Sequence, residues 1–113
     1  MDLSTAVLQL GALAQESRLS IYRLLVESGA NGLCAGDIGA QTKIAAATLS
    51  FHLKELVNSR LLTARREGRQ IYYAPDFDSM NGLMNYLTEN CCGGAGCGMG
   101  SNAKPRKRTE KSR

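Results

Sequence analysis

Residues 45–59, AAATLSFHLKELVNS, and residues 62–74, LTARREGRQIYYA, are the two stretches that decide the fold. The first carries apolar side chains at helical spacing, which form one stripe along a predicted helix. That stripe consists of Leu49, Leu53, Leu56 and Val57. The second stretch changes to a period of two, and Glu67-Gly68-Arg69 supplies the glycine that a tight hairpin turn needs. The sequence therefore predicts a helix followed directly by a β-hairpin.

The segments on either side of this unit are also predicted to be helical. Residues 3–14 repeat Leu3, Val7 and Leu10 at helical spacing, and a second helix is expected from a cap at Ser17 to near Gly29. Residues 30–32 are expected to form a turn, and residues 37–40 a short third helix. After Pro75 a last helix is expected to begin at Asp76 or Asp78, with Met80, Leu83, Met84 and Leu87 on its apolar face. The predicted fold class is mainly α with a β-hairpin wing.

Length and composition restrict the class of protein. A chain of 113 residues with 43% hydrophobic residues has room for one domain with a core. We expect a cytoplasmic protein without a membrane partner, because no stretch reaches about 20 apolar residues and the N-terminus lacks the basic start of a signal peptide. With one histidine, no carboxylate pair placed for acid–base work and no glycine-rich phosphate loop, we expect neither an enzyme nor an organic cofactor.

The formal net charge of +4 is concentrated in two zones. Basic residues outnumber acidic ones between residues 43 and 73, and again in the tail from Lys104 to Arg113. A basic surface suits contacts with phosphate, although a short basic tail is often only solubilising. Because only the first zone lies in a segment predicted to fold, it is the stronger candidate for binding nucleic acid.

A short helix, a tight turn and a longer helix with a polar outer face are typical of a helix-turn-helix. The longer helix fits the major groove, and a basic hairpin can lie along a neighbouring phosphate backbone. The predicted contacts with double-stranded operator DNA are Thr48, Ser50, Phe51, His52 and Lys54 in the helix and Arg65, Arg66 and Arg69 in the wing. Each piece alone is more often a solvated surface, but their order favours a winged helix-turn-helix.

Three segments resemble the ArsR/SmtB-type metalloregulators over roughly residues 5–90. Leu13–Ile21 (LAQESRLSI) resembles the family helix LADPTRLxIL, and Ala45–Leu56 resembles its recognition helix SQPTVSxHLKxL. The third, Arg65–Tyr73 (RREGRQIYY), resembles the family wing xRxGRxxYY. The resemblance implies a repressor that dimerises through its N- and C-terminal helices, here Leu3–Leu13 and Met80–Leu87. Ala45, Ala46 and Ala47 replace the family's serine, glutamine and proline, so the operator sequence cannot be inferred from relatives.

The cysteines are the second departure from the family pattern. Arsenic-responsive relatives carry ELCVCDL before the turn, whereas this chain has only Cys34, with Gly36 at the second position. One thiol cannot chelate an ion, so Cys34 is interpreted as a small buried residue. Cys91, Cys92 and Cys97 cluster instead, and they are similar to an end-of-helix NCC…C arrangement in other arsenic-responsive relatives.

Three thiolates suit a trigonal site for As(III) or Sb(III). The predicted organisation is residues 1–90 for DNA binding and dimerisation, 91–98 for the metalloid and 99–113 as a flexible basic tail. The sequence thus predicts a repressor of a metalloid resistance operon, released from its operator by the ion. It leaves open Cd(II) or Cu(I) as inducer, a redox switch, a cysteine cluster without function, and a thiol-rich metalloid buffer or carrier.

Overall fold

The computed structural model describes residues 1–90, and the predicted metalloid segment 91–98 and basic tail 99–113 lie outside the described residues. The helices are α1 (Leu3–Leu13), α2 (Glu16–Ser28), α3 (Ala35–Thr42), α4 (Ala46–Asn58) and α5 (Phe77–Thr88). The strands are β1 (Leu33–Cys34), β2 (Leu62–Glu67) and β3 (Gln70–Pro75). A mainly helical chain with a β-hairpin wing is therefore confirmed. Within the described part of the chain, none of these helices is both long and apolar enough to span a bilayer.

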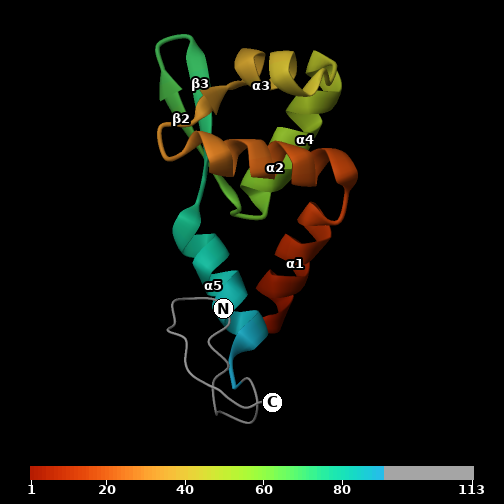
Figure 1. Cartoon of the computed structure of the whole chain (residues 1–113), viewed down its shortest axis with the longest axis vertical. Coiled ribbons are helices and arrows are strands. Elements are labelled where there is room, and N and C mark those ends of the chain that lie inside the picture. Colours follow the sequence, from red (N-terminus) through yellow and green to blue (C-terminus); the bar gives the residue numbers. More distant parts are fainter. Residues whose placement is uncertain (91–113) are drawn as a thin grey trace.

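The core lies where α2, α3 and α4 meet the base of the hairpin. Its fully buried side chains are Ile21 and Leu25 of α2, Ile38 of α3, Leu53 and Leu56 of α4, and Leu61 beyond it. Burying a side chain of this size contributes roughly 1.5–3 kcal/mol. The helix-turn-helix pair and the wing are therefore fixed to one another through a shared core. Figure 1 shows α1 and α5 converging at the end of the molecule opposite α3 and the hairpin tip.

The strands form a single antiparallel sheet in the order β1-β3-β2. β2 and β3 pair from Leu62↔Pro75 to Glu67↔Gln70, so Gly68 and Arg69 form the turn. This agrees with the turn predicted at Glu67-Gly68-Arg69, whereas β1 was not predicted from the sequence. β1 has only two residues, and it is a strand because it pairs with Tyr72 and Tyr73 of β3. A strand of that length leaves no periodic signal in the sequence.

The start of α2 and the length of α3 also differ from the sequence prediction. Gln15, not Ser17, caps α2: its side-chain oxygen accepts from the backbone N–H of Arg18 at 2.9 Å. Ser17 lies within the first turn of the helix. α3 extends over eight residues rather than four, despite the two glycines that lower its helix propensity. The predicted start of α5 near Asp76 or Asp78 is confirmed: Asp76 caps the helix, and its carboxylate accepts from the Ser79 backbone N–H at 3.1 Å.

α1 turns its apolar stripe away from the rest of the chain. Its inner face buries Ala6, Gln9 and Ala12, whereas Leu3 is 66% exposed and Val7 59% exposed. On α5, Leu83 is buried while Met84 and Leu87 are exposed. Exposed large apolar residues that cluster on two neighbouring helices are typical of a protein–protein interface. This is the surface on which the sequence analysis placed the dimer contact.

Candidate nucleic-acid interface

The turn between α3 and α4 sets the geometry of the helix-turn-helix. Lys43 closes α3 in the left-handed conformation with φ of 64°, and its backbone N–H donates to the Gly39 carbonyl at 2.8 Å. A β-carbon at Gly39 would stand 3.4 Å from a methyl carbon of Leu49 on α4, so the two helices approach closely there. Such a compact turn holds α4 at a fixed angle to α3 and leaves its outer face open.

The outer face of α4 carries most of the predicted DNA contacts. Thr48, Ser50, Phe51 and Lys54 are all exposed, and so is Ala47 near the start of the helix. Phe51 is 55% exposed, which is unusual for an aromatic ring on a polar face. Hydroxyls and an ammonium group can bond to base edges or phosphates, and an aromatic edge can meet a thymine methyl group. Their contact with DNA remains a prediction.

His52 does not belong to this outer face. His52 was predicted from the sequence as a DNA contact, but the residue is only 7% exposed. Its Nδ1 lies 3.3 Å from Nη1 of Arg18, and because arginine can only donate, Nδ1 accepts. Arg18 also donates from Nε to the Ala12 carbonyl at 2.7 Å. His52 therefore joins α4 to α2 and to the end of α1, and little of its ring is left for DNA.

The N-terminus of α4 lacks a side-chain cap. Ala45 occupies the cap position with φ −61° and ψ 147°, and its methyl group cannot accept a hydrogen bond from the helix. We expect Ala45→Ser to stabilise the domain by about 1 kcal/mol, because a serine oxygen can bond an unpaired N–H of the first turn. Thermal or urea unfolding measures the gain, and Ala40→Ser within α3 is the control. Equal effects of the two substitutions would contradict this interpretation.

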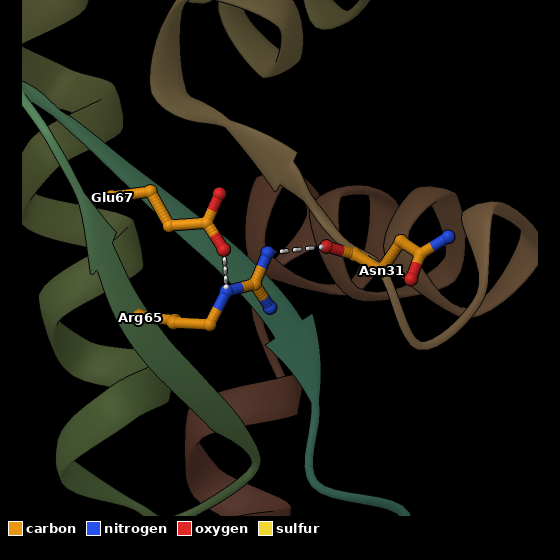
Figure 2. Close-up of polar contacts among 3 residues, drawn as sticks. All are labelled: Asn31, Arg65 and Glu67. Atoms are coloured by element: carbon orange, nitrogen blue, oxygen red, sulfur yellow. Dashed lines mark hydrogen bonds and ion pairs between the residues drawn. The ribbon is translucent and has the colours of Figure 1, made fainter.

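The wing is anchored by Arg65. Figure 2 shows its guanidinium between Glu67 on the same strand and the carbonyl of Asn31. Arg65 Nε donates to Glu67 Oε2 at 2.6 Å and Nη2 donates to the Asn31 oxygen at 3.1 Å. The guanidinium also lies over the ring of Tyr72, 5.4 Å from its centroid. Because these contacts join β2 to β3 and to the turn before β1, they fix the orientation of the hairpin relative to the rest of the domain.

Arg66 and Arg69 differ from Arg65 in having no side-chain partner among the residues that the structure describes. Both are exposed, and neither makes a side-chain hydrogen bond or an ion pair with any residue in the range 1–90. Arg69 lies in the turn next to Gly68, whose φ is +65°. Two unpaired cations at the tip of a hairpin are well placed to meet phosphate. The wing arginines predicted from the sequence thus divide into one anchoring group and two free ones.

Residue type and spacing carry little signal for the partners of these groups. Arg65 bonds to the main chain at Asn31, and a backbone carbonyl leaves no trace in residue type. Arg18 was noted only as part of the family-like stretch Leu13–Ile21, and its contact with His52 was missed. That contact has a weak signal, since His52 follows Leu49 by three residues and so lies on the buried side of the helix.

The described residues offer no metal site. Within residues 1–90, no three His, Cys, Asp or Glu side chains lie close enough to hold an ion. Cys34 is half-buried rather than fully buried as expected, and its Sγ donates to Asp37 Oδ2 at 3.3 Å. Cys91, Cys92 and Cys97 lie outside the described residues, so the predicted trigonal site stays a prediction.

Comparison with known proteins agrees with this geometry. Residues 13–65 match the family model of a helix-turn-helix domain. An arsenical resistance operon repressor of Bacillus subtilis is 33% identical over 81 residues, which cover 72% of this chain and 73% of the relative. A transcriptional repressor SmtB homolog of Synechocystis is 38% identical over 63 residues, covering 56% of this chain and 46% of the relative.

Among solved structures, the chain is similar to a homodimeric winged helix-turn-helix DNA-binding domain from Mycobacterium bovis, described as a possible ArsR-family regulator. The TM-score is 0.63 at 28% identity, covering 80% of this chain and 83% of that one. HlyU from Vibrio cholerae gives a TM-score of 0.62 at 26% identity, covering 81% and 99% of the two chains. Together with the helix-turn-helix and wing described above, these matches show that the chain belongs to the ArsR/SmtB family of winged-helix, DNA-binding transcriptional repressors.

Proposed function

We propose that this protein represses a metalloid resistance operon and binds its operator as a homodimer. The observation that carries the DNA-binding part is the exposed row Thr48, Ser50, Phe51 and Lys54 on α4, flanked by free wing arginines. The apolar faces of α1 and α5 support the dimer, because in a single chain they are open to water. Two copies paired through these faces would place their two recognition helices in successive major grooves on one side of the DNA.

The inducer in this proposal is As(III), with Sb(III) as the alternative ion of the same chemistry. It would bind to the thiolates of Cys91, Cys92 and Cys97, which follow α5 directly in the sequence. Relatives named arsenical resistance operon repressors support a metalloid inducer. Folding of the chain around the ion would change the end of α5 and, through the dimer contact, the spacing of the two recognition helices. Coupling of about 1–3 kcal/mol would weaken operator binding about 5- to 150-fold.

A gel-shift assay with the DNA upstream of the protein's own gene tests this proposal. We expect a discrete complex with this DNA that competitor DNA of unrelated sequence does not remove, and that arsenite dissociates. A metalloid buffer or carrier would show no sequence preference and no response of DNA binding to the ion. If the complex responds to peroxide or Cd(II) but not to arsenite, the proposed repressor function stands and the proposed inducer is wrong.

The salt dependence of operator binding tests the division of the wing arginines. The logarithm of the operator binding constant falls linearly with the logarithm of the salt concentration. Each phosphate contact that is lost makes this slope less steep by about 1. We expect Arg66→Ala and Arg69→Ala to lower the slope by about that amount each, because their guanidinium groups are free to meet phosphate. Arg65→Ala should change the slope less, since Glu67 and Asn31 already hold that group. A larger slope change for Arg65→Ala than for the other two would contradict the assignment.

A further inference from the structure

One amide side chain joins the recognition helix to both helices of the proposed dimer surface. Gln9 of α1 is completely buried, which is rare for glutamine. Its Nε2 donates to the carbonyl of Ser59 at 3.0 Å, and Ser59 is the C-terminal cap of α4. The same Nε2 lies 3.4 Å from Oγ of Ser79, in the first turn of α5. Three helices thus meet at one buried donor.

A groove adjoins the contact between Gln9 and Ser59. Beside it, the space between α1 and α4 opens into a groove of about 290 Å³, lined by Val7, Leu8, Gly11 and Ala12 of α1, Arg18 of α2, and Glu55, Asn58 and Ser59 at the end of α4. Ser59 is the residue of this lining that accepts from Gln9.

The Ser59 end of this contact is itself well fixed. Ser59 is 1% exposed, its Oγ donates to the Leu56 carbonyl at 3.0 Å, and its N–H donates to the Glu55 carbonyl at 3.1 Å. On the α5 side, the backbone N–H of Ser79 is held by the Asp76 carboxylate. Gln9 therefore connects the capped C-terminal end of α4 to the first turn of α5.

We propose that Gln9 is a positioning residue for operator binding: its amide sets the angle of the recognition helix relative to the dimer helices α1 and α5. This inference rests on the proposed dimeric operator binding. It predicts that Gln9 acts on the spacing between two recognition helices and not on the contact of either helix with its own half-site. A glutamine that only stabilised the fold would not influence spacing.

The test compares Gln9→Met, which keeps the side-chain length and removes the donor, with the wild-type dimer. Binding is measured by fluorescence anisotropy on the operator, on operators with one base pair inserted between or deleted from the half-sites, and on unrelated DNA. We expect operator binding to weaken about tenfold, an effect of the size that substitutions in a coupled network commonly have. The preference for native spacing should decrease as well, while binding to unrelated DNA stays unchanged. Leu13→Met, on the same helix, is the control for altered core packing.

The outcomes separate the two proposals. Wild-type protein that fails to bind the operator overturns the proposed function. If the wild type binds with a spacing preference and Gln9→Met binds equally well with the same preference, the role of Gln9 is overturned. The proposed function then still stands. Hydrogen exchange of the Gln9 side-chain amide in the wild-type operator complex, followed by NMR, decides the matter if the variant does not fold. Slow exchange supports the contact in the DNA-bound state, and exchange at the rate of free glutamine contradicts it.

Discussion

The double variant Cys91→Ser, Cys92→Ser should bind the operator as tightly as the wild type and no longer release it in arsenite. For the wild type we expect arsenite to weaken binding about 5- to 150-fold, the usual range of coupling between two sites. Serine is close to cysteine in size but is not a soft ligand, and Cys97 alone cannot form a chelate around the ion. Anisotropy of labelled operator DNA, titrated with protein at several arsenite concentrations, measures the change.

Cys34→Ser is the matched control for this experiment. Cys34 precedes α3, and in residues 1–90 it has no second cysteine beside it. We expect the control to respond to arsenite as the wild type does. Loss of the response in Cys34→Ser, with a normal response in the double variant, would move the sensor to the α3 region and contradict the proposed site.

Val7→Glu should break the dimer and reduce operator affinity at least about 100-fold. Val7 is 59% exposed in the centre of the outward face of α1, next to Leu3 and Leu10. A carboxylate placed in a dry interface loses its hydration without gaining a partner, so association becomes unfavourable. A monomer also loses the gain in affinity that two linked half-site contacts provide, which is commonly 10²- to 10⁴-fold.

Light scattering gives the mass of each variant and anisotropy gives its operator affinity. Val26→Glu is the control, because Val26 is also a valine, is 41% exposed, and lies on α2 away from the proposed dimer face. We expect the control to remain dimeric and to bind DNA with near wild-type affinity. A dimeric Val7→Glu protein with unchanged affinity would contradict the assignment of this face.

The parts of the fold that were predictable are those with a strong local period. The stripe of Leu49, Leu53 and Leu56 on α4 and the alternation around Gly68 are local signals, and both elements appear where the sequence placed them. β1 was not predictable, because its two residues are a strand only through pairing with β3, far along the chain. The Gln15 cap was missed because serine is the commoner cap residue and Ser17 stood close by.

The candidate site was predictable to the level of a surface but not of individual roles. Residue type and spacing located the outer face of α4 and the basic wing. They could not tell that Arg65 bonds to the Asn31 carbonyl or that His52 accepts from Arg18, since both contacts depend on the tertiary arrangement. The apolar period of α1 was visible, yet only the structure shows that the chain leaves it exposed and buries Gln9 on the opposite side.

In the proposed mechanism, occupancy of the sulfur site and binding to DNA oppose each other. The most direct measurement is the arsenite affinity of the free protein and of the operator complex, in thiol-free reductant without oxygen. Because coupling between two binding sites is reciprocal, DNA should weaken arsenite binding by the same factor by which arsenite weakens DNA binding. Equal arsenite affinities of the free and the DNA-bound protein would contradict the account.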